Sequence, residues 1–343
     1  MIELGLSLDV ILESFFLLLL PILAVAILFS ENMAAIAIMS CVFSMVMAVI
    51  YLLLAAPDVA MTESAIGAAI STAILIKSMQ LTQSRILSDK FFCLANIISF
   101  FALLFFGAMM IYGFADLPDY GQGSAPVNSY ISKDYIKNTP SEIGIASSVA
   151  AILASYRGFD TLGETLVIMV AGLVVYFVMN IERPVQVDLL DEKAEAVYEN
   201  KIWMTDYIRT MLLPVSLILA FYIQVHGEIS PGGGFQAGSV LSSIFIFYFV
   251  VADIKSINFH KMIKTLLKLS FVGFLIYLLM AIYTAVIGGY FLEYYAITGT
   301  LLGHKIGIFI IEIGVGITVF SVMLMIFLLF EYKLQSKPIT RST

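Results

Sequence analysis

Acidic residues interrupt several long apolar runs of this sequence. In "APDVAMTESAIGAAIS", Asp58 stands at the start of an apolar segment, and Thr62 and Glu63 lie about one to two helical turns further in. A charged side chain at the centre of a membrane helix costs about 2.5–3.5 kcal/mol on insertion scales, so such residues are usually functional or paired. A carboxyl group in a low-dielectric environment can carry a proton or exchange it for a cation.

Two further runs repeat this pattern. In "YRGFDTLGETLVIMVAG", Asp160 lies at the boundary of an apolar run and Glu164 follows four residues later, on the same face of a helix. In "HKIGIFIIEIGVGITVF", Glu312 is flanked by glycines that give the helix a thin face beside the acid. The candidate ion-pathway residues are therefore Asp58, Thr62, Glu63, Asp160, Glu164 and Glu312.

A structural explanation is open for the same residues. Glu63 and Glu164 could be acids favoured by the helix dipole near a helix start, or partners of a Lys in another subunit. Asp58 and Asp160 stand where capping of a helix N-terminus is an ordinary role. Both explanations remain open from the sequence.

The composition is that of a membrane protein. The 343 residues are 61% hydrophobic and only 13% charged, far from the balance of soluble domains. The apolar start has no basic residue before Lys77, so we expect it to be retained rather than cleaved as a signal. The two cysteines and three histidines show no ligand spacing, and we predict no cofactor and no metal site. So little basic surface argues against nucleic acid as a partner.

The apolar runs predict an all-α, polytopic protein with nine transmembrane helices. About 20 apolar residues are needed to cross a hydrocarbon layer of about 30 Å. With the N-terminus outside and the C-terminus inside, most of the 18 Lys and Arg residues fall in inner segments, as cytoplasmic loops require. The predicted spans are Leu6–Ser30, Met33–Ala56, Val59–Ile76, Phe91–Phe114, Thr161–Asn180, Thr210–Val225, Phe235–Ala252, Leu269–Phe291 and Ile306–Phe330.

Two long connections divide the chain into modules. The outer one is rich in Pro, Gly and Ser up to residue 142 and predicts an irregular loop. Residues 143–155 are uncharged but too short to span, and indicate an interfacial or re-entrant helix, or else a surface helix. The predicted domains are 1–85 with three spans, 86–182 with two spans and the outer loop, 183–208 as an inner linker, and 209–343 with four spans.

The segment "HGEISPGGGFQAGS" places three consecutive glycines between two short spans. It lacks the preceding strand and the following Lys of a nucleotide-binding loop. Glycine permits a tight reversal or the close approach of another backbone, so we predict a packing hinge beside His226 and Glu228, pressed against a partner subunit. An ordinary loop between two helices is the alternative. The candidate loop-packing residues are Pro231, Gly232, Gly233, Gly234 and Phe235.

Three of the quoted motifs resemble known families. "APDVAMTESAIGAAIS" resembles the MbhD subunit of membrane-bound hydrogenases, which is similar to the C-terminal part of MrpA, the large component of Mrp-type Na⁺/H⁺ antiporters. "YRGFDTLGETLVIMVAG" looks like the adjoining MbhE subunit. "HGEISPGGGFQAGSVL" together with "GIFIIEIGVGITVF" looks like the MnhB/MrpB subunit. The order of the motifs agrees with the division into three, two and four spans.

The resemblance implies a fused subunit of a multisubunit cation/proton antiporter in the cell (plasma) membrane. It implies other antiporter subunits as partners, Na⁺ and H⁺ as ions, and a place in the ion path for Glu63 and Glu164. Nothing here matches the long proton-pumping subunits of this family, so we expect the chain not to transport alone. The main alternative is a structural adaptor of a hydrogenase or complex I-like assembly. An independent transporter and an enzyme are less favoured, because neither paired broken helices nor a nucleophile and base appear.

Overall fold

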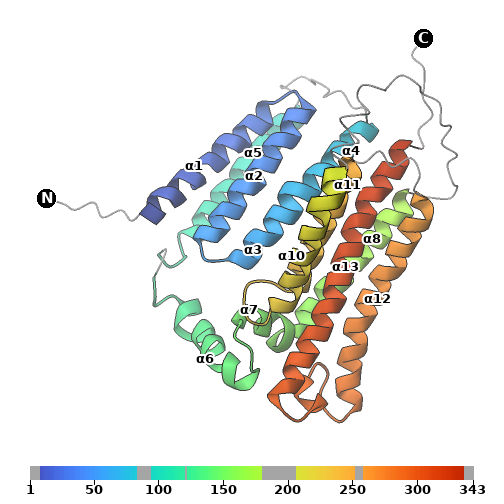
Figure 1. The fold of residues 1–343 in the computed structure, drawn as a ribbon. Helices are drawn as coiled ribbons and strands as arrows, with labels where there is room; N and C mark the ends of the chain where they lie inside the picture. Colours follow the sequence, from blue (N-terminus) through green and yellow to red (C-terminus); the bar gives the residue numbers. More distant parts are fainter. Residues whose placement is uncertain (1–7, 83–93, 120–121, 180–205, 252–257, 336–343) are drawn as a thin grey trace. The chain divides into compact units, whose positions relative to one another are not determined.

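The computed structural model describes residues 8–82, 94–119, 122–179, 206–251 and 258–335, and in these ranges every regular element is a helix. Nine of the described helices are long and apolar enough to cross a membrane (Figure 1). This confirms the predicted all-α fold, while the orientation of the termini stays a prediction. Residues 183–205 of the predicted inner linker lie outside the described ranges. The candidate spans are Val10–Phe29, Met33–Leu53, Pro57–Leu81, Ile97–Phe114, Gly158–Met179, Ile208–His226, Gly234–Val251, Phe259–Val286 and Leu301–Leu334.

The chain divides into two compact units, Met1–Thr82 with Thr139–Thr343, and Gln83–Asn138. The first holds every candidate site residue. Its long helices are α1 (Leu8–Phe29), α2 (Met33–Leu53), α8 (Gly158–Met179), α10 (Leu213–His226, after the π-turn η4, Ile208–Leu212), α11 (Gly234–Val251), α12 (Phe259–Val286) and α13 (Leu301–Gln335). The third span combines α3 (Pro57–Thr62), η1 (Glu63–Ser71) and α4 (Thr72–Thr82), and η5 (Tyr294–Ile297) precedes α13.

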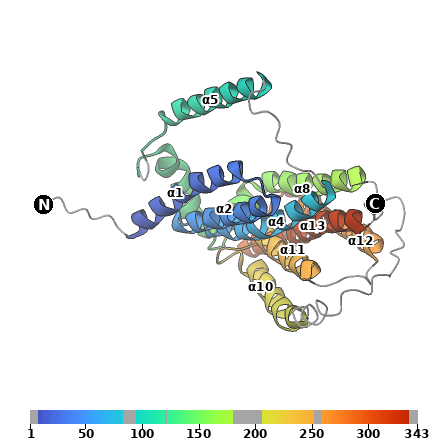
Figure 2. The same ribbon diagram turned by 90° about the horizontal axis from the view of Figure 1, so that it is seen from above.

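Helix α13 forms the centre of the first unit, packed against α4, α8, α11 and α12, with α10 beside α11 (Figure 2). Small residues let the backbones approach, as is common between membrane helices. A Cβ at Gly273 of α12 would lie 2.6 Å from the carbonyl oxygen of Gly314 of α13, and one at Gly238 of α11 would lie 2.6 Å from that of Gly316. The glycines beside Glu312 therefore pack against two neighbouring helices.

The third span departs from the prediction of one continuous α-helix. Pro57 occupies its first turn as expected, but residues Glu63–Ser71 form a π-helix. π-Helical turns are rare and often lie at functional sites. The helix of the third span also extends beyond Ile76 to Thr82, so Lys77 lies in a helix and not in a connecting loop; its place on the inner side stays a prediction.

The predicted irregular loop is wrong in part. Within it lie η2 (Val127–Ile131) and α6 (Ser132–Glu142), although α6 contains Pro140 and many weak helix formers. Next come α7 (Ser148–Ala151) and η3 (Ile152–Tyr156). Ala151 is fully buried in the core of the first unit, so this short segment is not a surface helix.

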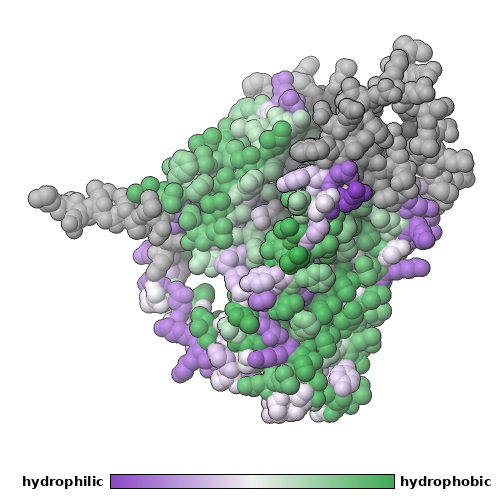
Figure 3. Space-filling model, in the orientation of Figure 1, coloured by the Kyte–Doolittle hydropathy of each residue, from purple (hydrophilic) through white to green (hydrophobic). Residues whose placement is uncertain are grey.

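Large apolar side chains cover the outside of the helices (Figure 3). In α1, Leu18 and Leu28 are 67% and 80% exposed. In α5 (Leu94–Phe114), the long helix of the second unit, Leu103 and Ile111 are 71% and 72% exposed. Such faces suit lipid or other membrane subunits, because the bilayer core offers no water to polar groups.

Candidate ion-pathway site

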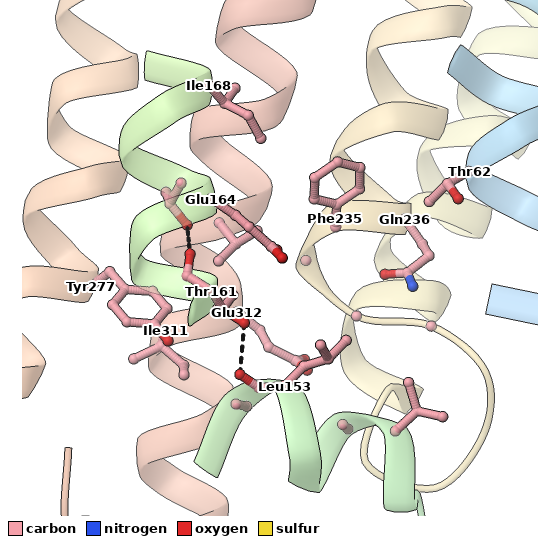
Figure 4. Close-up of a pocket in the computed structure, with 18 of the residues that line it drawn as sticks. Thr62, Leu153, Thr161, Glu164, Ile168, Phe235, Gln236, Tyr277, Ile311 and Glu312 are labelled. Carbon is pink, nitrogen blue, oxygen red and sulfur yellow. Dashed lines mark hydrogen bonds between the residues drawn. The ribbon is translucent and has the colours of Figure 1, made fainter. Parts of the chain in front are cut away.

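A cavity of about 420 Å³ lies where the third span, α8, α12 and α13 meet the glycine-rich segment. Two carboxylates line it, Glu164 from α8 and Glu312 from α13 (Figure 4). Glu164 points into the space between α8 and Phe235 (Figure 4). The other polar side chains of the lining are Thr62, Thr161, Thr165, Gln236 and Tyr277, and the backbones of Gly232, Gly233 and Gly234 complete the wall.

The glycine loop, defined here as residues 227–233, reverses the chain between α10 and α11. Gly232 and Gly233 have φ values of +154° and +128°, in a region that favours glycine. The Gly233 amide donates to the Ile223 carbonyl at 3.1 Å. A Cβ at Gly234 would overlap the carbonyl oxygen of Glu312. The three glycines thus allow a turn and a direct backbone contact with α13, which an ordinary loop would not need.

Asp58 fastens the glycine loop to the third span. Its Oδ1 accepts hydrogen bonds from the Gly232 amide at 2.7 Å and from Gln236 Nε2 at 3.3 Å. Helix α3 has no side-chain cap hydrogen bond, so the capping explanation for Asp58 is wrong. On the other side of the loop, the Glu228 carbonyl accepts from the amides of Ala146 and Ser147 at 3.1 and 2.9 Å. The loop therefore joins all three predicted modules of this one chain.

Glu312 lies directly against the glycine loop. A Cβ at Gly233 would stand 3.1 Å from Glu312 Oε1 and 3.4 Å from Gln236 Oε1. Because Gln236 Nε2 also reaches Asp58, an amide separates the two carboxylates around Gly233. Carboxylate and amide oxygens beside a non-helical backbone are features of ion sites in membrane transporters. This group can hold a proton or a small cation.

Hydrogen bonds fix the walls beside Glu164. Thr161 Oγ1 donates to the Leu153 carbonyl at 2.7 Å, which ties α8 to η3 (Figure 4). The Tyr277 hydroxyl donates to the Gly158 carbonyl at 2.7 Å, which ties α12 to the start of α8. Tyr277 is fully buried. Sequence reasoning missed Tyr277 because it lies in a span without charged residues, and it missed Gln236, which follows the predicted loop-packing residues directly.

Three predicted ion-pathway residues do not line the cavity: Asp58, which holds the glycine loop and Gln236 beside it, and Glu63 and Asp160. The Glu63 carboxylate lies against Gly67 of its own π-helix, where a Cβ would also be 2.8 Å from Ser44 Oγ of α2. Asp160 forms an ion pair with Arg157, at 2.5 Å to Nη2, and both side chains are about half exposed. Such surface pairs contribute little to stability. The structure thus brings together Asp58, Thr62, Glu164 and Glu312, and leaves Glu63 facing α2 and Asp160 at the surface.

His226 and Glu228 have different neighbours at the mouth of the loop. His226 stacks on Tyr222 with ring centroids 4.0 Å apart, and its Nδ1 lies 3.1 Å from the Tyr222 carbonyl oxygen. Glu228 is half-buried beside the loop. Burial raises the pKa of the Glu228 carboxyl, and the positive charge of Lys305 opposes this rise. The carboxyl group of Glu228 is therefore disposed to take up protons more readily than an exposed glutamate.

Replacing Asp58 tests the hydrogen bonds that hold the glycine loop to the third span. We expect Asp58→Ala to lower the stability of the first unit by about 1–3 kcal/mol, because the Gly232 amide loses its acceptor in a partly buried place. Asp58→Asn keeps an acceptor oxygen and should cost less. Thermal unfolding of the purified complex measures the loss, with Asp116→Ala, an exposed change in the second unit, as the control. Equal stability of the Asp58→Ala and wild-type complexes would contradict the role of these hydrogen bonds.

Three family models match successive parts of the chain. The family model of the MbhD subunit of the membrane-bound hydrogenase (MBH) matches residues 18–84. That of the MbhE subunit matches residues 108–194. The model described as a domain related to the MnhB subunit of Na⁺/H⁺ antiporters matches residues 204–325. A putative antiporter subunit mnhB2 of Staphylococcus haemolyticus is 36% identical over 123 residues, which are 33% of this chain and 83% of the relative. The chain belongs to the Mrp-type antiporter subunits.

Other relatives of this Mrp-type subunit differ in length and name. An uncharacterised protein of Methanocaldococcus jannaschii is 31% identical over 216 residues, covering 58% of this chain and 73% of the relative. A probable A/B-type subunit of a K⁺/H⁺ antiporter of Rhizobium meliloti is 27% identical over 161 residues, or 42% of this chain, and the match covers only 15% of that longer protein.

A solved structure shares the fold. A chain in the Mrp complex from Dietzia sp. DQ12-45-1b matches with a TM-score of 0.71 and 19% identity. The match covers 96% of this chain and 35% of the Dietzia chain. The fold of this fused Mrp-type subunit therefore corresponds to about a third of a longer chain.

Proposed function

We propose that this subunit contributes carboxylates to the ion pathway of a multisubunit monovalent cation/proton antiporter in the plasma membrane, with Na⁺ as the cation. The observation that carries the proposal is the cavity in which Glu164 and Glu312 lie together beside the glycine loop. We also propose that the chain consists of three domains, 1–85, 86–182 and 209–343, with a linker between the last two.

The chemistry of exchange at this cavity is competition for carboxylate oxygens. A protonated carboxyl group loses its proton to water when a cation takes its place, and the cation leaves when a proton returns, so each site holds one positive charge in either state. The amide of Gln236 and the hydroxyl of Thr62 offer further oxygen atoms in the same wall. Glu164 and Glu312, on different helices, provide two positions between which an ion can pass.

One relative is named as a subunit of a K⁺/H⁺ antiporter, whereas the matching MnhB family model names a Na⁺/H⁺ antiporter. The identity of the cation therefore needs its own test. Proton release from inverted membrane vesicles that contain the complete complex should rise with added NaCl more steeply than with KCl. A steeper response to KCl would replace Na⁺ by K⁺ in the proposal and leave the carboxylates in place.

Replacing Glu164 tests the pathway itself. We expect Glu164→Gln to lower the exchange rate at least about tenfold, because the amide keeps the size of the side chain but can neither release a proton nor carry negative charge. Glu164→Asp should retain part of the exchange. Glu293→Gln, outside the cavity lining on the loop before η5, is the control with wild-type exchange. Full exchange by the Glu164→Gln complex would remove Glu164 from the path.

The structural-adaptor alternative predicts a different result. The glycine loop joins three modules through hydrogen bonds of its backbone to the Asp58 carboxylate and to the amides of Ala146 and Ser147, which a purely structural role would also use. Under that alternative, exchange survives when Glu63, Glu164 and Glu312 are neutralised together. Under the proposal, exchange is lost while native gel electrophoresis still shows the complete complex.

A further inference from the structure

A second cavity, also of about 420 Å³, lies between the third span and α11. Its lining comes from the end of the π-helix, from α4 and from the C-terminal half of α11. The lining is apolar apart from four side chains, Thr72, Lys77, Gln80 and Ser243. The first cavity lies near the N-terminal ends of α3 and α11, so the two cavities occupy opposite ends of the same helix pair.

An ion pair borders the second cavity. Lys77 Nζ lies 2.6 Å from Glu331 Oε2 of α13, and the two side chains are only 18% and 19% exposed. A charged side chain inside a membrane span is costly unless it is paired, and removing one partner of such a pair leaves an uncompensated charge. The pair links the third span to α13 near the end opposite Glu312. The first cavity does not include it.

Polar side chains lie at helical spacing on one face of α11 between the two cavities. Gln236 lines the first cavity and Ser243 lines the second, seven residues later on the same helix. The fully buried Ser239 stands between them at helical spacing, three residues after Gln236 and four before Ser243. The π-helix Glu63–Ser71 lies across from this face. A polar line therefore runs from the proposed cation site toward Lys77.

We propose that the second cavity is a water-filled proton entrance to the pathway, and that the Lys77–Glu331 ion pair closes it and repels metal cations. A cavity of this size accommodates several water molecules, and because Lys77 lines it while Glu331 does not, the positive end of the ion pair faces the cavity. Protons can pass along water and hydroxyl groups, whereas Na⁺ meets a like charge. This inference rests on the proposed function, because it extends the path that begins at Glu164 and Glu312.

Thiol labelling of the complete complex tests the cavity. In a background where Cys41 and Cys93 are replaced by Ala, Ser243→Cys should react with small methanethiosulfonate reagents. Ser242→Cys, the neighbouring and fully buried position outside the lining, is the matched control and should react at least about tenfold more slowly. Equal, slow labelling of both positions would overturn the proposal, because the cavity would then be closed to water.

Labelling with reagents of opposite charge tests the role of Lys77. In the Ser243→Cys complex, Lys77→Met should lower the ratio of the anionic to the cationic labelling rate at least about tenfold, since a nearby positive charge is removed. Lys77→Arg should keep this ratio and most of the exchange, while Lys77→Met lowers exchange at least about tenfold. An unchanged ratio, or wild-type exchange by the assembled Lys77→Met complex, would overturn the gating role.

These outcomes are separable from those of the proposed function. Labelling of Ser243→Cys does not require turnover, so it reports on the cavity even if Glu164→Gln retains exchange. Conversely, loss of exchange in Glu164→Gln with no labelling at residue 243 would uphold the carboxylate pathway and reject this entrance.

Discussion

Gly234→Val is expected to prevent accumulation of the assembled complex. A Cβ at this position would overlap the carbonyl oxygen of Glu312 and lie 2.9 Å from the amide nitrogen of Gly316. Both obstacles are backbone atoms of α13, the buried central helix, and neither can rotate away. Overpacking in cores costs about 1–3 kcal/mol even where side chains can adjust, so a backbone clash should cost at least about 3 kcal/mol.

The measurement is the amount of complete complex in membranes, read by native gel electrophoresis. Gly163→Val is the matched control, because Gly163 also lies in a membrane helix of the first unit but has open space where a Cβ would be added. We expect the Gly163→Val complex at near wild-type amounts and the Gly234→Val complex at about a tenth or less. Normal amounts of the Gly234→Val complex would show that α11 and α13 do not touch as described.

The packing of the glycine loop could be predicted from the sequence only in part. The run of glycines beside Pro231 predicts a tight reversal or a close backbone approach, and in the structure Gly234 packs directly against the Glu312 carbonyl oxygen. The partner of the loop was not predictable, because its hydrogen bonds go to Asp58 and to Ala146 and Ser147, far away in the chain. Contacts within this chain therefore account for the glycines without a partner subunit. That a partner subunit packs against the loop stays a prediction.

The membrane helices follow from local properties. Long apolar runs predict where the chain crosses the bilayer, because each span satisfies its own backbone hydrogen bonds. The π-helix was not predictable in this way, since Ala65, Gly67 and Ala68 are compatible with both helical registers. Which acid faces which neighbour depends on that register. Asp58 turns to the loop, while Glu63, five residues later, turns to α2.

Long-range pairing also explains why the helical position and the partner of Lys77 were not predicted. Charges near span ends normally indicate loops, and nothing local distinguishes Lys77 from the basic residues that follow it. Its partner Glu331 lies near the other end of the chain. A sequence read one segment at a time predicts the charge but not the contact that makes the charge tolerable inside a span.

Glu312→Gln is expected to abolish exchange while the complex remains assembled. Glu312 lies against the glycine loop, beside Gln236 and near the carboxylate that binds the Gly232 amide. Glutamine has nearly the same shape, so the contacts of α13 with Gly233 are retained and assembly should be unaffected. It cannot exchange a proton for a cation, and we expect the exchange rate to fall at least about a hundredfold.

The assay is cation-induced proton release in inverted vesicles, normalised to the amount of assembled complex. Glu63→Gln belongs in the same series, because Glu63 was predicted for the pathway yet lies against Gly67 and near Ser44 and not in the cavity. Loss of exchange in the Glu312→Gln complex alone would favour a path through the cavity. The opposite result would be loss of exchange in the Glu63→Gln complex with normal exchange in the Glu312→Gln complex. It would place the ion path between the π-helix and α2, because a carboxylate that can be neutralised without effect carries no ion.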